Sequence, residues 1–262
     1  MADHELIVSL AKELRIAEET GHAVEPLSER HPELTVDDAY AVQLENVRAR
    51  LAGGDRVVGH KAGLTSVAMQ RQLGVDEPDF GHLVASQGVG NGGVVDAGRL
   101  LQPKVELEIG FLIGAPLEGP GVTVADILAV TTGVFPTLEI IDSRIADWRI
   151  RLVDTVADAA SGARFVLPSR VTPLAGLDLR VLGGIMEVNG RLSSWSCGAA
   201  ALGDPLLCVA WLANLLARYG GRLEPGHVVL SGALAAAVPV AAGDVVTATF
   251  DRLGTASVRF DA

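Results

Sequence analysis

The segment "KVELEIGFLI", residues 104–113, reads as a β-strand with two carboxylates on one face. Successive side chains of a strand point to opposite faces, so Glu106 and Glu108 share a face and stand about 7 Å apart along the strand. The opposite face is apolar and comprises Val105, Leu107, Ile109 and Phe111. Because like charges repel and burial of an unpaired charge is unfavourable, the segment predicts either a solvent-facing row or a bound cation.

A third glutamate lies in a similar apolar context. Glu139 stands in "FPTLEIIDSR", residues 135–144, between Leu138 and Ile140. Three glutamates on apolar strands suit a hard divalent cation such as Mg²⁺ or Mn²⁺, since these ions prefer oxygen ligands. The alternative is that Glu106 and Glu108 line the solvent face of a half-exposed strand, and the spacing alone does not decide between the two.

Two further ionisable residues stand in unusual settings. Lys61 lies in the apolar, glycine-rich "VVGHKAGL", residues 57–64. Burial there would lower the pKa of Lys61 toward a range useful for proton transfer, whereas a lysine that extends its ammonium group to solvent is the alternative. Asp79 follows Pro78 in a "DEPDFG" loop and on its own is typical of a turn.

Composition excludes several classes of function. The chain has 262 residues, 49% hydrophobic and 20% charged, which is typical of a globular protein. Its net charge of −11 and aromatic content of 4% argue against binding to nucleic acid or to an anionic membrane. No run approaches the ~20 apolar residues that span a bilayer, and the N-terminus does not resemble a signal peptide. Two cysteines are too few for a disulfide framework, so we expect a cytoplasmic protein.

Helical patterns come first and a strand-rich body follows. Apolar residues recur at helical spacing near the N-terminus, at Leu6, Ile7, Leu10, Leu14 and Ile16. A second helix is predicted between a Thr35 cap and Gly53, and shorter ones at 65–74, 124–131 and 205–221. There is no regular βα alternation, repeat or linker. We therefore predict a single α+β domain over 1–262, with a helical section at 1–54 and a strand-rich catalytic body at 55–262.

Six blocks of the sequence together resemble a known family. They are "GHKAGLTS…MQ…LGVDEPDFG" (59–81), "QPKVELEIGFLI" (102–113), "LEIIDSRI" (138–145), "VDTVADAASGARFVL" (153–167), "GAAALGDPLLCVAWLAN" (198–214) and "VVLSGALAAAVPVAAGD" (228–244). In order and spacing they are similar to the 2-hydroxypenta-2,4-dienoate (2-keto-4-pentenoate) hydratases. The relatives of these enzymes are the 2-oxo-3-hexenedioate (4-oxalocrotonate) decarboxylases, and the group has the fumarylacetoacetate-hydrolase-like fold.

The resemblance extends from about residue 5 to 260 and implies both a fold and an assembly. The implied fold is a mixed β-roll or barrel core with N-terminal helices. The implied assembly is a ring-like homo-oligomer, a pentamer or decamer, with a pathway aldolase or decarboxylase as a further candidate partner.

The resemblance also implies roles for individual residues. Carried over by position, the metal ligands are Glu106, Glu108 and Glu139. The catalytic residues carried over in the same way are Lys61, Asp79 and Ser161. The chain departs from the family pattern at two positions: Ala159 stands where Asn is common, close to the expected site, and Asp204 stands where His is common. We interpret Asp204 as a helix cap.

The implied activity is that of a hydro-lyase, a carbon–oxygen lyase of the meta-cleavage route of aromatic catabolism. Its small anionic substrate, 2-hydroxypenta-2,4-dienoate or a substituted analogue, gains water to give 4-hydroxy-2-oxopentanoate with Mg²⁺ or Mn²⁺ as cofactor. One alternative is decarboxylation of 2-oxo-3-hexenedioate, whose second carboxylate calls for an additional cation. Another is a non-catalytic partner subunit of the same family. The segments "SGAL" (231–234), "DEPDFGHL" and "VDTVAD" favour the hydratase.

Overall fold

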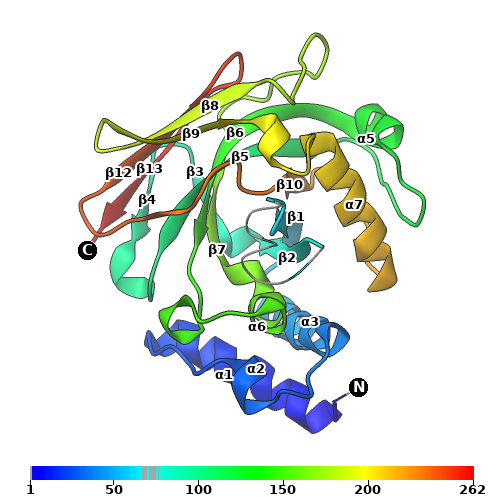
Figure 1. Cartoon of the computed structure of the whole chain (residues 1–262), viewed down its shortest axis with the longest axis vertical. Helices are drawn as coiled ribbons and strands as arrows, with labels where there is room; N and C mark the ends of the chain where they lie inside the picture. Colours follow the sequence, from blue (N-terminus) through cyan, green and yellow to red (C-terminus); the bar gives the residue numbers. More distant parts are fainter. Residues whose placement is uncertain (1, 67–69, 71–74, 76) are drawn as a thin grey trace.

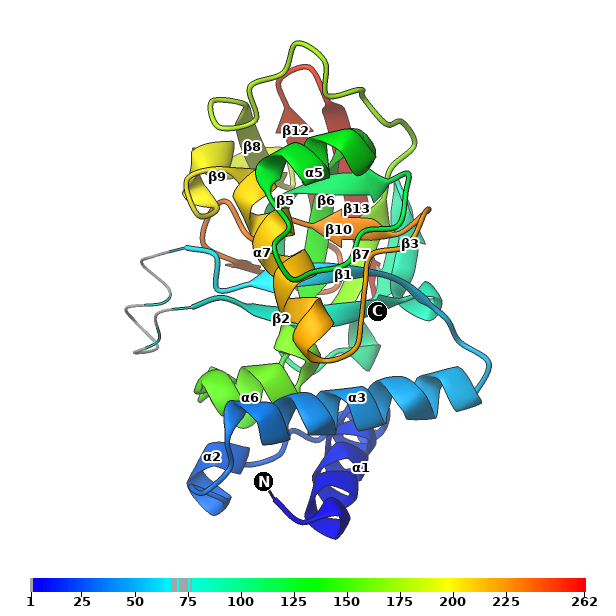
Figure 2. The ribbon, with the colours of Figure 1, turned by 90° about the vertical axis from the view of Figure 1, so that its right-hand side faces the viewer.

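The helices within residues 4–52 and 152–157 form one end of the molecule below two β-sheets, whereas those at 124–130 and 205–218 lie beside the sheets (Figures 1 and 2). The structure is a computed structural model that describes residues 2–66, 70, 75 and 77–262, so most of the short helix expected at 65–74 lies outside the described residues. The helices are α1 His4–Thr20, α2 Leu27–Arg30, α3 Val36–Ala52, α5 Val124–Val130, α6 Leu152–Ala157 and α7 Pro205–Arg218. Single 3₁₀ turns occur at Ala85–Gln87, Ala97–Arg99, Ala146–Trp148, Ala159–Ser161 and Gly198–Ala200.

The helix ends follow the predicted capping chemistry. Thr35 and Asp38 form a reciprocal capping box at the start of α3, which ends at Gly53 as expected. Asp204 accepts a hydrogen bond from Leu206 N at 2.9 Å, so its interpretation as the cap of α7 agrees with the structure. The helix predicted from apolar spacing near the N-terminus is confirmed as α1, in which Ile7, Leu10 and Leu14 are buried and Ile16 is 46% exposed.

The larger sheet has the strand order β2-β1-β10-β5-β6-β7-β3, with β11 paired to β5. Its strands are β1 Val57–Gly63, β2 Asp79–Val84, β3 Gly88–Gly90, β5 Lys104–Ile113, β6 Thr131–Ile141, β7 Gly162–Leu167, β10 Val228–Leu230 and β11 Val238–Pro239. The smaller sheet has the order β4-β13-β12-β8-β9. Its strands are β4 Gly93–Asp96, β8 Gly183–Val188, β9 Arg191–Cys197, β12 Val245–Phe250 and β13 Gly254–Asp261.

The predicted α+β class, a mixed strand-rich core with N-terminal helices, is confirmed. Within the described ranges both sheets are open, because the end strands of each sheet do not pair with one another. Strand β3 has only three residues and pairs only with β7, which leaves too little strand at that edge to close a barrel.

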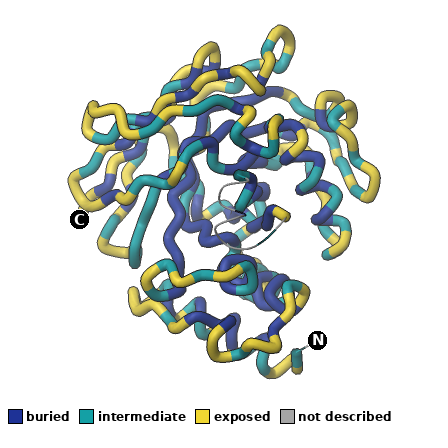
Figure 3. The backbone as a smooth tube through the Cα atoms, in the orientation of Figure 1, coloured by how far each residue is buried: buried dark blue, intermediate teal, exposed yellow. Residues whose placement is uncertain are grey.

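A common core joins the helical end to the sheets. One cluster of buried side chains includes Leu10 of α1, Val42 of α3, Ile109 of β5 and Phe260 of β13. Figure 3 shows the buried backbone concentrated in the central strands and the exposed backbone in the outer loops. This shared core supports our proposal of a single domain. Among the described residues, no helix is both long and apolar enough to cross a membrane.

Candidate active site and metal centre

Three glutamates meet on one face of the larger sheet. Strands β5 and β6 are antiparallel, and their register places Glu106 directly opposite Glu139. Glu108 follows two residues along β5 and therefore shares that face. One carboxylate oxygen from each residue lies within 4.8 Å of the others. Glu108 is also fixed from the loop after β10, because Gly232 N donates a hydrogen bond to Glu108 Oε2 at 2.7 Å.

The carboxylates of this cluster are buried with few hydrogen-bond donors. Glu108 and Glu139 are 0% and 1% exposed, while Glu106 keeps some exposed surface. Among the described residues, Glu108 Oε1 and both oxygens of Glu139 have no hydrogen-bond partner. Burial and then the charge of Glu139 raise the pKa of Glu106 to about 7. Burial also raises the pKa of Glu108 and of Glu139. The solvent-facing alternative for this strand therefore does not describe the structure.

Lys61 extends from β1 into the same cluster. Its Nζ donates a hydrogen bond to Ala160 O at 2.7 Å and lies 3.2 Å from Glu139 Oε1. Gly81 stands opposite Lys61 in β2, and a side chain there would meet Lys61 Cδ at 3.3 Å. Burial alone would lower the pKa of Lys61, but the charges of the surrounding carboxylates, Glu139 foremost, raise it. The predicted fall in this pKa is therefore wrong for the protein without a bound cation.

Asp79 is the first residue of β2, so its interpretation as a turn residue is wrong. It pairs with Gly63 of β1, and a Cβ at Gly63 would lie 2.0 Å from Asp79 Oδ1, which only glycine avoids. Thr155 Oγ1 of α6 donates a hydrogen bond to Asp79 Oδ2 at 3.1 Å. Asp79 Oδ1 has no partner in the described part of the chain. Burial raises the pKa of Asp79, although the charge of Lys61 opposes this effect.

Ser161 lies in the 3₁₀ turn between α6 and β7. Its hydroxyl lies 3.5 Å from Asp158 Oδ2 and donates a long hydrogen bond to it. Within the described residues no hydrogen bond joins this hydroxyl to Lys61, Asp79 or the glutamates. The turn does reach the cluster, because a Cβ at the following residue, Gly162, would lie 3.3 Å from Glu139 Oε1. The structure therefore brings Ser161 next to the cluster without joining its hydroxyl to it.

Comparison with known proteins matches this architecture. The family model described as "Fumarylacetoacetate (FAA) hydrolase C-terminal" matches residues 57–261, the body that contains the cluster. The chain belongs to the fumarylacetoacetate hydrolase family.

Individual relatives of this family cover nearly the whole chain. The chain is 44% identical over 254 residues to a 4-oxalocrotonate decarboxylase of Pseudomonas sp. (strain CF600), covering 97% of this chain and 96% of that protein. It is 45% identical over 247 residues to a 2-keto-4-pentenoate hydratase of Dechloromonas aromatica, with 94% of each covered. A solved 4-oxalocrotonate decarboxylase of Pseudomonas putida G7, complexed with magnesium and adipate, has a TM-score of 0.96, 42% identity and 99% coverage of both chains.

The cluster in this family member fits a divalent cation on its own geometry. Three buried carboxylates beside a single ammonium group repel one another unless a further cation binds between them or protons are taken up. All of the converging atoms are carboxylate oxygens, the ligands that Mg²⁺ and Mn²⁺ prefer. Glu106 is the least buried of the three residues.

Sequence reasoning missed residues that act through their backbone. Gly232 N and Ala160 O contact Glu108 and Lys61, yet a backbone contact has no signature in side-chain chemistry. The glycines opposite Lys61 and Asp79, at 81 and 63, were detectable only as glycines inside strand patterns.

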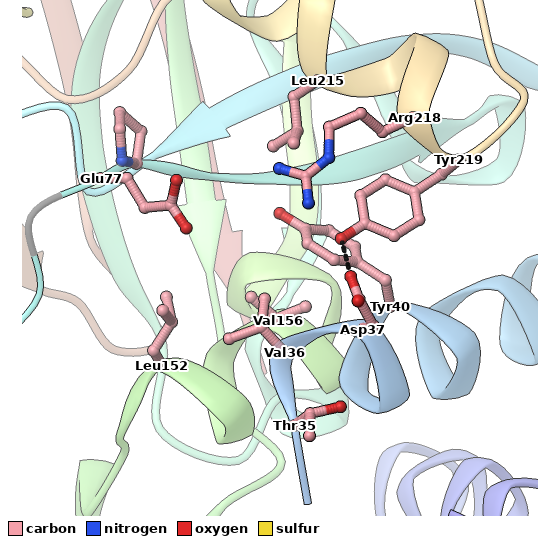
Figure 4. A pocket seen from close by; sticks show the side chains of 11 residues that line it. Thr35, Val36, Asp37, Tyr40, Glu77, Leu152, Val156, Leu215, Arg218 and Tyr219 are labelled. Atoms are coloured by element: carbon pink, nitrogen blue, oxygen red, sulfur yellow. Dashed lines mark hydrogen bonds between the residues drawn. The ribbon is translucent and has the colours of Figure 1, made fainter. Parts of the chain in front are cut away.

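A cavity of about 180 Å³ lies apart from the carboxylates, between α3, α6, α7 and the residues before β2 (Figure 4). Its walls combine Tyr40, Tyr219 and the guanidinium of Arg218. Tyr219 donates a hydrogen bond to Asp37 Oδ1 at 2.7 Å. Because none of the three glutamates lines it, this cavity is distinct from the predicted metal centre.

Proposed function

We propose that the protein is a metal-dependent hydratase that adds water to 2-hydroxypenta-2,4-dienoate, or to a substituted analogue, to give 4-hydroxy-2-oxopentanoate. The observation that carries this proposal is the convergence of Glu106, Glu108 and Glu139 beside the buried ammonium group of Lys61. The full-length relatives named as hydratases, at about 44% identity, support the same activity.

Glu106, Glu108 and Glu139 would hold the divalent cation, which we propose to be Mg²⁺ or Mn²⁺. Support comes from the relative whose structure contains magnesium. When bound, such an ion supplies Lewis-acid stabilisation of the negative charge that develops on the C2 oxygen of the substrate.

Lys61 and Asp79 are the candidates for the proton transfers. The enol of the substrate loses its O–H proton and C5 gains one, which gives an enone. Water then adds at C4, loses a proton to a base, and C3 is protonated. Lys61 is oriented by Ala160 O, and Asp79 by Thr155. Because both groups are buried and interact, they share the acid and base roles as a coupled pair. Ser161 is proposed to bind the substrate carboxylate or to orient the water.

The decarboxylase is the second candidate, because relatives with that name match equally well. Its substrate has an additional carboxylate, which is recognised best by a second cation. Among the described residues, Lys61 is the cation in ion-pair contact with the cluster carboxylates. The segments "SGAL" (231–234), "DEPDFGHL" and "VDTVAD" support the hydratase as the first candidate. The chemistry of the cluster also argues against a non-catalytic subunit, since a scaffold gains nothing from buried, repelling carboxylates.

A product assay separates the three candidates. Protein is incubated with Mg²⁺ and, in separate samples, with 2-hydroxypenta-2,4-dienoate and 2-oxo-3-hexenedioate, and products are identified by NMR. We expect 4-hydroxy-2-oxopentanoate from the first substrate and no CO₂ release from the second. Faster CO₂ release from the second substrate would instead assign the decarboxylase. Turnover of neither substrate would favour the non-catalytic subunit.

We also propose that the chain forms a homo-oligomer through the outer face of β8 and β9. Ile185 and Trp195 face each other across these strands and are 40% and 69% exposed, and Leu192 nearby is 56% exposed. Strand β9 is at the end of its sheet, where an unpaired edge invites association.

Light scattering tests this association. The wild type should have the mass of a pentamer or decamer, and Trp195→Glu should reduce it. A monomeric wild type would contradict the proposal and direct attention to a pathway aldolase or decarboxylase as partner.

The unpaired Cys197 and Cys208 support our further proposal of a cytoplasmic location.

A further inference from the structure

Three consecutive residues beside the cluster have a left-handed backbone. Ala159, Ala160 and Ser161 have φ angles of 53°, 51° and 54°. None is glycine, and the left-handed region is unfavourable for a non-glycine residue. Such a turn persists only where surrounding contacts determine it, and backbone strain of this kind gathers at functional sites.

The left-handed turn supplies the contacts that fix Lys61. The carbonyl of its central residue, Ala160, accepts the only hydrogen bond that Lys61 Nζ donates within the described residues. The carbonyl of Ala159 lies over Gly81, where a Cβ would approach it to 2.4 Å. Gly162, which ends the turn, packs against Glu139 Oε1. A displacement of this turn would therefore move the ammonium group relative to the carboxylates.

The guanidinium of Arg144 donates hydrogen bonds to both ends of the turn, at Asp158 and at Gly162. At the start, its Nε and Nη2 donate hydrogen bonds to Asp158 Oδ1 and Asp158 O, each at 2.5 Å. At the end, its Nη1 donates a hydrogen bond to Gly162 O at 3.2 Å. Outside the turn, Nη1 also donates to Asp142 O at 2.6 Å. Arg144 is 5% exposed and Asp158 is 2% exposed. The planar guanidinium thus spans the turn with fixed geometry, which the single ammonium group of a lysine does not reproduce.

We propose that Arg144 is a positioning residue, which with Asp158 holds the left-handed turn so that Ala160 O orients the Lys61 ammonium group. The role in turnover rests on the proposed function, while the role in holding the turn does not. A buried ion pair is by itself weak evidence for a stabilising role. Three of the four side-chain hydrogen bonds of Arg144 go to the two ends of one strained turn, which argues for control of its geometry.

The test compares Arg144→Lys with a matched control, Arg50→Lys. Arg50 Nη2 pairs with Glu18 Oε2 at 2.5 Å between α3 and α1, so the control also replaces the guanidinium of an arginine–carboxylate pair. We expect Arg144→Lys to lower kcat by ~10–100-fold, as for other supporting residues of metal sites and for small misplacements of catalytic groups. KM should change less than about threefold, since substrate contacts remain. Arg50→Lys should keep kcat within about twofold of wild type.

A second variant tests whether strain in the left-handed turn causes the loss of kcat in Arg144→Lys. Ala159→Gly removes the penalty of the left-handed conformation at the half-exposed first position of the turn. The double variant with Arg144→Lys and Ala159→Gly should have a kcat at least about threefold higher than Arg144→Lys alone. Such coupling between two substitutions is expected only for residues that act on the same element. A loss of kcat that this glycine leaves unchanged would overturn the proposal, as would a kcat of Arg144→Lys equal to wild type.

Hydrogen exchange gives a readout independent of turnover. The backbone amides of 158–164, measured by mass spectrometry, should exchange faster in Arg144→Lys and at wild-type rates in Arg50→Lys. If the wild type turns over neither dienoate nor hexenedioate, the proposed function fails, and this measurement still decides the structural role. Unchanged exchange at 158–164 in Arg144→Lys would overturn that role.

Discussion

Glu106 and Glu139 lie directly opposite each other across the β5–β6 pair, with the buried Glu108 beside them. Like charges placed opposite each other in a sheet are destabilising, so this pairing weakens the fold unless a cation or protons neutralise it. The arrangement therefore links metal affinity, pH and stability, and each link leads to a measurement.

Glu106→Gln should weaken Mg²⁺ binding and turnover together. The substitution removes one of three carboxylate ligands while keeping the shape of the side chain, and the loss of affinity should be at least ~10–100-fold. Isothermal titration calorimetry gives the affinity and the dienoate assay gives kcat. Glu187→Gln, a glutamate on β8 of the other sheet, is the matched control. Wild-type kcat for Glu106→Gln at saturating Mg²⁺ would show that Glu106 is not a ligand.

Lys61→Ala should slow the chemistry and leave metal binding intact. Removal of a positioned proton-transfer group typically lowers the rate by ~10²–10⁴-fold. The ammonium group lies 3.2 Å from Glu139 Oε1 and competes with a cation there, so Mg²⁺ affinity should stay equal or rise. The two quantities are measured on the same preparation. If kcat is unchanged, Lys61 has no part in the reaction.

The stabilisation by Mg²⁺ should increase with pH. The pKa of Glu106 is raised from 4.5 to about 7, and the pKa values of Glu108 and Glu139 are raised as well. Between pH 4.5 and about 7, the metal-free folded protein therefore binds more protons at Glu106 than the unfolded chain does. The stability that these bound protons contribute falls as pH rises. Because protons compete with the cation for these oxygens, the gain in Tm on adding Mg²⁺ should be small at low pH and large above the pKa of Glu106.

Comparing Tm with and without Mg²⁺ separates the titration of the glutamates from that of the histidines. Burial lowers the pKa of His60, of His82 to about 4, and of His227. These groups make stability rise with pH, but they do so in both the metal-free and the Mg²⁺-bound protein. Differential scanning fluorimetry between pH 5 and 8 measures the difference. A gain in Tm that is the same at every pH would contradict the assignment of the glutamates.

Thr155→Val should lower kcat modestly through Asp79. The substitution keeps the shape and removes the hydrogen bond to Asp79 Oδ2, an interaction of net value about 0.5–1.5 kcal/mol. We expect kcat to fall by roughly 2–10-fold with Mg²⁺ affinity unchanged. Thr131→Val, which removes a hydroxyl bond to Ile127 O, is the control. Equal effects of the two substitutions on kcat would mean that Thr155 does not act through Asp79.

Strand alternation was sufficient to predict that Glu106 and Glu108 share a face, because a period of two is a local property. The pairing of Glu106 with Glu139 depends on the register between β5 and β6, which no local pattern determines. The resemblance to a family supplied that connection. On its own the Pro-Asp pair at Asp79 is typical of a turn, whereas pairing with Gly63 makes Asp79 the start of a strand.

Other features lay beyond any sequence pattern. The left-handed turn at Ala159–Ser161 contains no glycine or asparagine, so nothing in its composition signals positive φ angles. Strand β3 has only three residues, and it lies in the glycine-rich segment "GVGNGG" (88–93), where no alternation of side chains indicates a strand. The raised pKa of Lys61 reflects carboxylates from three other strands, which sequence places far apart.

The most direct test of the central claim is a titration of Mg²⁺ into metal-free protein, with ultraviolet absorbance of 2-hydroxypenta-2,4-dienoate and the amount of bound metal followed on the same sample. We predict that turnover is absent without Mg²⁺ and rises in proportion to occupancy of one site per chain, with 4-hydroxy-2-oxopentanoate as product, and that Glu106→Gln shifts both curves to higher Mg²⁺ together. Equal turnover in metal-free and Mg²⁺-saturated protein would contradict the account.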